Sequence, residues 1–412
     1  MENVSLLQKR QIQFVVFLPV FNVLASILTP FFAGSFNPGV FRGIVLTLFF
    51  VWFLIAKFKL NRFNRLYFIY MLYVLVLCFL SDDILTSLYI YNKFFICTMM
   101  FFVGITYINT NLKFLHLLRS FMVGLILLIV YLGISNVFNI GTQTYKDESV
   151  YFGETGVNIT KSLTIFLIIL PLYIRLETNR IFRLIAIYLI FIGATFVLLG
   201  MKRSSILALL SGFFFYFLLT PYKGRIVSVI PIVLGLLVLA SPYIFPIIEK
   251  RFSARQQRVS MTYNQLRESE TEGRVVELQL TLQESFSGNF SKLFIGYNVF
   301  LKKDYLGHQR MLHVDYTNML GGAGILGLFL FIIGYLNSLF NIRKLYLKLK
   351  SIVLMREFFA VSASLIAIQA FLSIGGTLQG VTLRGYILLL LGAITRIMYV
   401  KYITLKSEVK SA

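Results

Sequence analysis

The chain has 412 residues, of which 58% are hydrophobic, and its formal net charge is +22. Apolar runs of about 20 residues, the length that crosses a roughly 30 Å hydrocarbon core, recur almost from end to end. These features exclude a soluble globular protein. Because the basic residues mostly flank the apolar runs, the charge indicates membrane topology and excludes nucleic acid as a partner.

The apolar runs predict an all-α, polytopic membrane helix bundle of about twelve spans. We expect spans one to nine within residues 1–246, a large extracytoplasmic loop at 247–315, and spans ten to twelve with a cytoplasmic tail at 316–412. Cys78 and Cys97 fall inside apolar runs, which favours packing roles over a disulfide or a metal site. The expected spans are 12–33, 40–56, 66–80, 94–109, 117–138, 157–176, 181–200, 204–220, 226–246, 316–340, 357–375 and 383–400.

The distribution of Lys and Arg predicts that both termini are cytoplasmic. With the N-terminus inside, alternate connections carry most of the basic residues, while Asp82, Asp83, Asp147, Glu148 and Glu154 fall outside. Two outer segments break this rule. Lys202 and Arg203 lie in the turn between spans seven and eight, and the 247–315 loop carries ten Lys or Arg.

The outer loop contains basic residues in helical register. Arg251, Arg255 and Arg258 share one helix face, and a second amphipathic helix is expected from about Arg274 to Ser285. Arginine pairs bidentately with phosphate oxygens, and a nearby histidine such as His313 can accept a proton near neutral pH. The loop therefore predicts binding of a lipid-linked phosphate or diphosphate.

Each of these residues also has a structural explanation. The three arginines at the start of the loop could lie on anionic headgroups, and Arg203 could snorkel from the end of its span. Arg274 could be a solvated helix residue, and His313 a hydrogen-bonded interfacial histidine. Asp315 could cap the N-terminus of the tenth span. The sequence has no HExxH, CxxC, P-loop or dinucleotide-binding pattern, so neither a metal nor a cofactor is expected.

Three segments resemble the O-antigen ligase and O-antigen polymerase superfamily. The first, His313 to Gly327, reads HVDYTNMLGGAGILG, and has a histidine followed eleven residues later by Gly-x-x-Gly at Gly324. The second, Glu272 to Asn298, reads EGRVVELQLTLQESFSGNFSKLFIGYN, with an arginine leading a helix and then an apolar-Gly-x-Gly element at Gly296. The third begins at Met201, reads MKRSSILALL, and resembles a Ser-Arg-small turn that places Arg203 at the outer end of a span.

The resemblance implies an inverting, metal-independent membrane glycosyltransferase. His313 would deprotonate the acceptor hydroxyl, and Arg203 and Arg274 would hold the diphosphate of an undecaprenyl-linked donor. Lys202, Arg251, Arg255, Arg258 and Asp315 are accessory candidates. The sequence departs from the family pattern at Val314, where an asparagine is common, and at Asn298, which stands at the second glycine of the Gly-x-Gly element.

The expected function is that of a surface polysaccharide polymerase at the outer face of the bacterial inner membrane, with the large loop in the periplasm. Its partners would be the lipid-linked glycan donor, a glycan acceptor, membrane lipids and a chain-length regulator protein. One alternative is an O-antigen ligase, whose acceptor is lipid A-core. We favour the polymerase because polymerases are the more numerous branch. A lipid-linked oligosaccharide flippase is the alternative from another class, against which stands the absence of a visible repeat between the two halves.

Overall fold

The computed structural model describes residues 6–32, 37–140, 151–153, 156–200, 202–224, 242, 245–246, 249–250, 253, 270–287, 289–296, 298–300, 303–305, 308–310, 312, 314–378 and 380–411. These residues are helical except for connections and one antiparallel hairpin, β1 (Lys303–Tyr305) with β2 (His308–Arg310). The helices are α1 (Leu6–Leu28), α2 (Pro38–Ala56), α3 (Arg65–Phe79), α4 (Ile84–Tyr107), α5 (Asn111–Val137), α6 (Ile159–Leu176), α7 (Arg180–Leu199), α8 (Arg203–Leu219), α10 (Glu270–Ser287), α11 (Phe290–Ile295), α12 (Asp315–Lys348), α13 (Val353–Ser373) and α14 (Tyr386–Ser411).

Nine helical segments in the described part of the chain are long and apolar enough to cross a membrane. They are α1 with the following 3-10 turn, α2, α4, α5, α6, α7, α12, α13, and α14 with the π-helical turn Val381–Gly385 before it. Helices α3 and α8 are apolar but shorter, at 15 and 17 residues. The chain is therefore a polytopic helical bundle. Eleven of the twelve expected spans overlap a helix, and the other, 226–246, lies almost wholly outside the described residues.

Three helix boundaries differ clearly from the expectation, and one of them is the end of α14, at Ser411 instead of 400. Helix α4 begins at Ile84, ten residues before the expected span, because the side chain of Asp83 caps it by accepting the backbone N–H of Thr86 at 3.0 Å. Helix α12 continues to Lys348, past the expected end at 340, and its last turns carry Arg343 and Lys344 beyond the apolar run.

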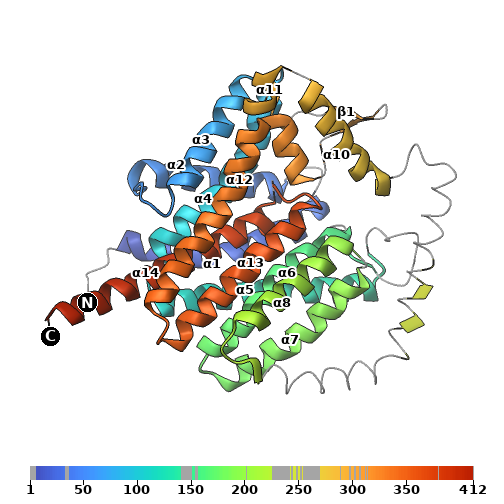
Figure 1. Ribbon diagram of the computed structural model, residues 1–412. Coiled ribbons are helices and arrows are strands. Elements are labelled where there is room, and N and C mark those ends of the chain that lie inside the picture. Colours follow the sequence, from blue (N-terminus) through green and yellow to red (C-terminus); the bar gives the residue numbers. More distant parts are fainter. Residues whose placement is uncertain are drawn as a thin grey trace.

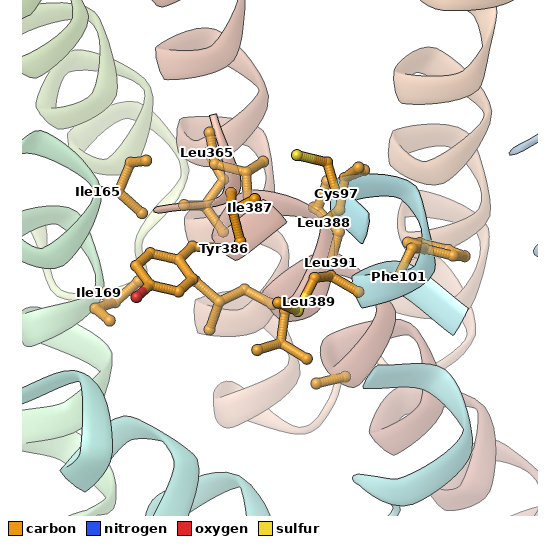
Figure 2. Close-up of a cluster of buried hydrophobic side chains, with 14 of the residues drawn as sticks. Cys97, Phe101, Ile165, Ile169, Leu365, Tyr386, Ile387, Leu388, Leu389 and Leu391 are labelled. Atoms are coloured by element: carbon orange, nitrogen blue, oxygen red, sulfur yellow. The ribbon is translucent and has the colours of Figure 1, made fainter. Parts of the chain in front are cut away.

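The centre of the bundle is the first half of α14. Tyr386 to Leu391 are fully buried, in keeping with a helix that is apolar on every side. Figure 2 shows five of these side chains, from Tyr386 to Leu389 and Leu391, between Cys97 and Phe101 of α4 on one side and Ile165 and Ile169 of α6 on the other. Cys97 and Cys78 are both buried free thiols, as expected.

Glycines allow α4 and α14 to cross at close range. A β-carbon on Gly104 would come within 2.4 Å of the backbone oxygen of Leu389, and one on Gly392 within 2.3 Å of that of Phe101. Small residues at a crossing let helix backbones approach where lipid supplies no hydrophobic driving force between helices. Helices α4 and α14, like α8 and α13, are therefore among the most closely packed helix pairs in the described part of the bundle.

Two helices of the 247–315 region, α10 and α11, lie at one end of the bundle. Both pack on α12, and Figure 1 shows them in gold, with α11 beside α3. The expected helix at 274–285 is confirmed as α10, in which, among the side chains that the structure describes, Thr281 is buried and Leu278 is exposed.

Candidate functional site

The two ends of the bundle are distinguished by their contacts. The Glu357 end is where α13 begins and α6, α8 and α12 finish: Glu357 accepts the hydroxyls of Tyr216 and Thr220, both at 2.7 Å, and Nε of Arg356 donates to the Leu219 carbonyl at 3.0 Å. The opposite Asp315 end is where α6, α8 and α12 begin and α13 finishes.

An ion pair stabilises the Glu357 end. Arg119 of α5 donates to both carboxylate oxygens of Glu177, at 2.8 and 3.0 Å, and the hydroxyl of Tyr173 donates to the same carboxylate at 3.0 Å. The arginine, with help from the backbone N–H of Asn179 and from Tyr173, lowers the pKa of Glu177 to about 2. The Glu177 carboxylate thus links α5 to the end of α6, so its role is structural.

At the other end, Asp315 fixes the start of α12. Its carboxylate is 3% exposed, accepts the backbone N–H groups of Thr377 and Leu378 at 2.8 and 3.0 Å, and accepts the hydroxyl of Thr377 at 2.7 Å. The suggestion that Asp315 is the N-cap is wrong. The capping position is Val314, and the Asp315 carboxylate reaches across to the turn after α13, where two N–H groups would otherwise lack acceptors.

The same turn holds a buried lysine from α6. Lys161 is 3% exposed, and its ammonium donates to the carbonyls of Gly375, in a short contact, and Gly376, at 2.9 Å. Lys161 and Asp315 thus bind neighbouring residues of one turn, Gly375 to Leu378. This turn connects the start of α6 with the start of α12.

Helix α8 begins beside α6 at this end. Ser205 of α8 and Thr160 of α6 share a hydroxyl hydrogen bond of 2.9 Å, and Lys202 donates to the side chain of Asn158 in a short contact. Arg203 is the first residue of α8 and is exposed. Arg203 therefore begins a helix at the position where the sequence predicts the start of a span.

Several expected site residues lie wholly or partly outside the described part of the chain. His313, Arg251, Arg255 and Arg258 lie outside the described residues, and Arg274 is described only as a position near the start of α10, without its side chain. Leu312 and Asp315, which flank His313 at a distance of one and two residues, are both buried. The structure therefore brings together Lys202, Arg203 and Asp315 of the expected set, at one end of the bundle.

The two glycine elements that carry the family resemblance meet in space. Gly324 has φ +67° and breaks the helical geometry of α12, and Gly296 has φ +86° at the end of α11. The break frees the carbonyl of Ala323, which accepts the hydroxyl of Tyr73 at 2.8 Å, and the same hydroxyl makes a short contact with the carbonyl of Ile295. Tyr73 of α3 therefore joins both glycine elements.

Asn298 occupies a position that suits glycine. Its φ is +63°, in the left-handed region that asparagine tolerates better than most residues. Its side chain accepts the backbone N–H of Asp82 at 2.8 Å and donates to the Asp82 carboxylate at 2.5 Å. The departure from the family pattern at this position is thus compatible with the backbone that a glycine would adopt.

A fully buried arginine lies between the Asp315 end and the core. Arg384, in the π-helical turn before α14, donates through Nε to the Tyr335 hydroxyl at 3.0 Å and approaches the Leu378 carbonyl at 3.4 Å and the Thr98 hydroxyl at 3.5 Å. Its guanidinium also lies 4.6 Å from the ring centre of Phe94. The backbone N–H of Leu378 donates to Asp315, and its carbonyl faces Arg384. Asp315 and Arg384 therefore both hold the turn after α13.

Sequence reasoning did not single out Lys161 or Arg384. Lys161 falls inside an expected span and Arg384 lies at the edge of another, and an ionisable residue within an apolar run is itself a signal of function in membrane proteins. Comparison of the sequence with protein-family models and with curated proteins finds no match.

Proposed function

We propose that this chain is a membrane glycosyltransferase that moves glycan from an undecaprenyl diphosphate carrier to a second lipid-linked glycan, which is the polymerase reaction. The acceptor hydroxyl would lose its proton to His313 and attack the anomeric carbon. The bond from that carbon to the phosphate oxygen would break, and the carrier diphosphate would leave with its charge held by Arg203 and Arg274. The diphosphate is a good leaving group, so the step needs no protein nucleophile.

The observation that carries the proposal is the convergence at the Asp315 end. Lys161, Lys202 and Arg203 start α6 and α8 there, and the turn bound by Lys161 also binds Asp315, two residues after His313. A catalytic base and a cationic site for a diphosphate would have to lie at the same end of the bundle. The resemblance in the segments around Arg203, Arg274 and His313 supports the same assignment.

We further propose that the Asp315 end faces the periplasm, that both termini are cytoplasmic, and that the chain crosses the inner membrane twelve times. The support comes from the Glu357 end, where helix termini carry most of the described basic residues, as the positive-inside rule requires of a cytoplasmic side. These residues are Lys57, Lys59, Arg62, Arg65, Lys113, Arg119, Arg175, Arg180, Arg183, Lys223, Arg343, Lys344, Lys348, Lys350, Arg356, Lys401 and Lys406. A single cysteine placed at Ser269 should react with impermeant thiol reagents from the outside, and labelling only from the cytoplasm would contradict this orientation.

Two other functions, those of a ligase and of a flippase, make predictions that differ from those of the polymerase. A ligase would use the same donor site and the same base but a lipid A-core acceptor. A flippase is favoured by the buried Lys161, Arg384 and Glu357, since transporters place ionisable groups inside their spans.

The test of the proposed function is the surface glycan of cells that lack the gene, compared with cells that carry His313→Ala or Arg203→Lys. Acceptor capped with a single repeat in all three strains supports the polymerase, because lysine cannot reproduce the bidentate arginine contact. Bare acceptor with long polymer on the carrier indicates the ligase. Repeat units trapped on the cytoplasmic side indicate the flippase and contradict the proposal.

A further inference from the structure

Three cations from separate parts of the chain gather on one face of the last turns of α14. Tyr399, Tyr402 and Lys406 share this face, because they are spaced three and four residues apart on the helix. Lys348 of α12 donates to the Tyr402 hydroxyl at 3.3 Å and lies 4.6 Å from the centre of its ring. The guanidinium of Arg62 lies 5.4 Å from the ring centre of Tyr399. Arg62 and Lys406 both act electrostatically on the Tyr402 phenol, so all three cations converge on it.

No carboxylate balances these three charges within the described part of the chain. The three cations are exposed, and none of them makes an ion pair there. The carboxylates of Glu177 and Glu357, at the same end of the bundle, are already hydrogen-bonded to other side chains. Glu408 follows Lys406 by two residues and therefore points to the other side of α14. Like charges that stand close together repel one another, so the cluster favours an anion as its partner.

The hydrogen-bond donors of the cluster are available to such an anion. The Tyr402 oxygen accepts from Lys348, and no acceptor among the described residues receives the Tyr402 O–H itself. Arg62 is held by aromatic rings: its guanidinium lies 4.7 Å from the ring centre of Phe63, which meets the Tyr399 ring edge to face at 5.1 Å. An arginine stacked on rings in this way keeps its N–H groups for a phosphate or a carboxylate.

Apolar side chains flank the cations, which favours an anionic lipid over a free anion. Leu60, Leu347 and Ile403 are exposed, and each stands within two residues of a member of the cluster. A headgroup phosphate would lie among the cations while its acyl chains cover these side chains. Basic clusters at the ends of membrane spans commonly bind anionic lipids. Figure 1 shows the last turns of α14, in dark red, extending past the other helices, where lipid can approach them.

We infer that Arg62, Lys348, Tyr402 and Lys406 form a binding site for the phosphate group of an anionic lipid, which we call the Tyr402 site. The three cations pair with the phosphate oxygens, and the Tyr402 hydroxyl donates to one of them. The inference goes beyond the proposed function and does not depend on it, because the Tyr402 site lies at the opposite end of the bundle from Asp315. In the proposed orientation the lipid belongs to the cytoplasmic leaflet.

The rival explanation is that these cations only orient the chain across the membrane. Arg62→Gln and Lys348→Gln each remove one charge from the Tyr402 site, and Arg180→Gln is the matched control. Arg180 is exposed at the same end of the bundle and begins α7, which packs on α5, α6 and α8. Tyr402→Phe removes the hydroxyl without changing the charge, so a site built around the phenol should respond to it and a diffuse charge should not.

The experiment measures binding to the purified full chain in detergent by native mass spectrometry, with phosphatidylglycerol, phosphatidylcholine and inorganic phosphate as separate probes. We expect the wild type to bind phosphatidylglycerol more tightly than phosphatidylcholine. Arg62→Gln and Lys348→Gln should each weaken the binding of phosphatidylglycerol about fivefold, as the loss of one basic residue implies. Tyr402→Phe should weaken it about threefold through the lost hydrogen bond, and Arg180→Gln should bind like the wild type. Melting temperatures close to that of the wild type would show that the variants are folded.

The outcomes separate a built site from general surface charge. Equal losses in Arg180→Gln and in the two glutamine variants of the Tyr402 site would overturn the site, because net charge alone would then govern binding. Wild-type affinity in Arg62→Gln, Lys348→Gln and Tyr402→Phe would overturn it as well. Binding of inorganic phosphate that the same three substitutions weaken, without a preference for phosphatidylglycerol, would support the phosphate site and contradict a lipid as its ligand.

Discussion

Gly296 and Gly324 lie so close that a β-carbon on Gly296 would come within 2.4 Å of the backbone nitrogen of Gly324. Both residues have positive φ, +86° and +67°, a conformation that costs an L-residue about 1–2 kcal/mol before any overlap is counted. The contact fixes the end of α11 against the break in α12. It thereby holds α11 on α12.

Replacement of either glycine by alanine should therefore destabilise the protein by more than about 2 kcal/mol, because the backbone atoms it meets cannot move aside. The thermal unfolding of the purified protein in detergent measures this loss. Gly133→Ala, in open space on α5, is the control and should melt like the wild type. Equal melting temperatures for Gly324→Ala and Gly133→Ala would contradict the close contact.

The carboxylate of Asp315 should be indispensable for the turn after α13. In Asp315→Ala, three buried donors of Thr377 and Leu378 lose their acceptor, and each unsatisfied group costs about 1–3 kcal/mol. Asp315→Asn keeps one acceptor oxygen and should lie between the alanine variant and the wild type in melting temperature. Asp83→Ala, at the exposed N-cap of α4, is the matched control and should lose less. An asparagine variant no more stable than alanine would contradict the role of these hydrogen bonds.

The ion pair of Arg119 and Glu177 should give a specific pH dependence. The pKa of Glu177 is lowered from 4.5 to about 2, so its contribution to stability is fully present above pH 4.5 and is lost as the pH falls toward about 2. The difference in melting temperature between the wild type and Glu177→Gln should be constant above pH 4.5 and shrink below it. A difference that grows on acidification would have the wrong sign for a carboxylate with a lowered pKa.

The contribution of Arg384 to the stability of the fold should depend on its planar guanidinium group and not on its charge alone. Arg384→Lys keeps the charge but cannot reach the Tyr335 hydroxyl, the Leu378 carbonyl and the Thr98 hydroxyl together, so we expect a loss of about 2 kcal/mol. Arg396→Lys on α14 is the comparison, since Nε of Arg396 has no hydrogen-bond partner among the described residues. Equal unfolding temperatures for the two lysine variants would show that the contacts of Arg384 contribute little.

The sequence predicts the elements of this fold better than it predicts their contacts. Apolar run length locates α6 to within two residues, because the signal depends only on the thickness of the hydrocarbon layer. It misses the first ten residues of α4, where polar residues such as Asn92 and Lys93 interrupt the apolar run but the Asp83 cap still starts the helix. Local pattern carries no information about such a cap when the run that follows is mixed.

In the candidate site, too, the position of a residue in an element can be predicted from the sequence, but its contacts cannot. Arg203 is recognisable from the sequence because the predicted topology puts it at the start of a span on the side that the positive-inside rule disfavours. The role of Asp315 is not, because its partners Thr377 and Leu378 lie more than 60 residues along the chain and supply backbone donors that any sequence would have. The resemblance singles out Gly296 and Gly324 separately, but only the folded backbone brings them into contact.

The central claim is that this chain transfers glycan from a polyprenyl diphosphate with His313 as the base. The most direct measurement is transfer by the purified chain in liposomes that contain undecaprenyl-diphosphate-linked repeat units, for the wild type and for His313→Ala. The account predicts that longer lipid-linked glycan forms with the wild type and that the folded His313→Ala variant forms none. Equal product from both proteins would remove His313 from the mechanism, and no product with either a glycan or a lipid A-core acceptor would contradict the proposed function itself.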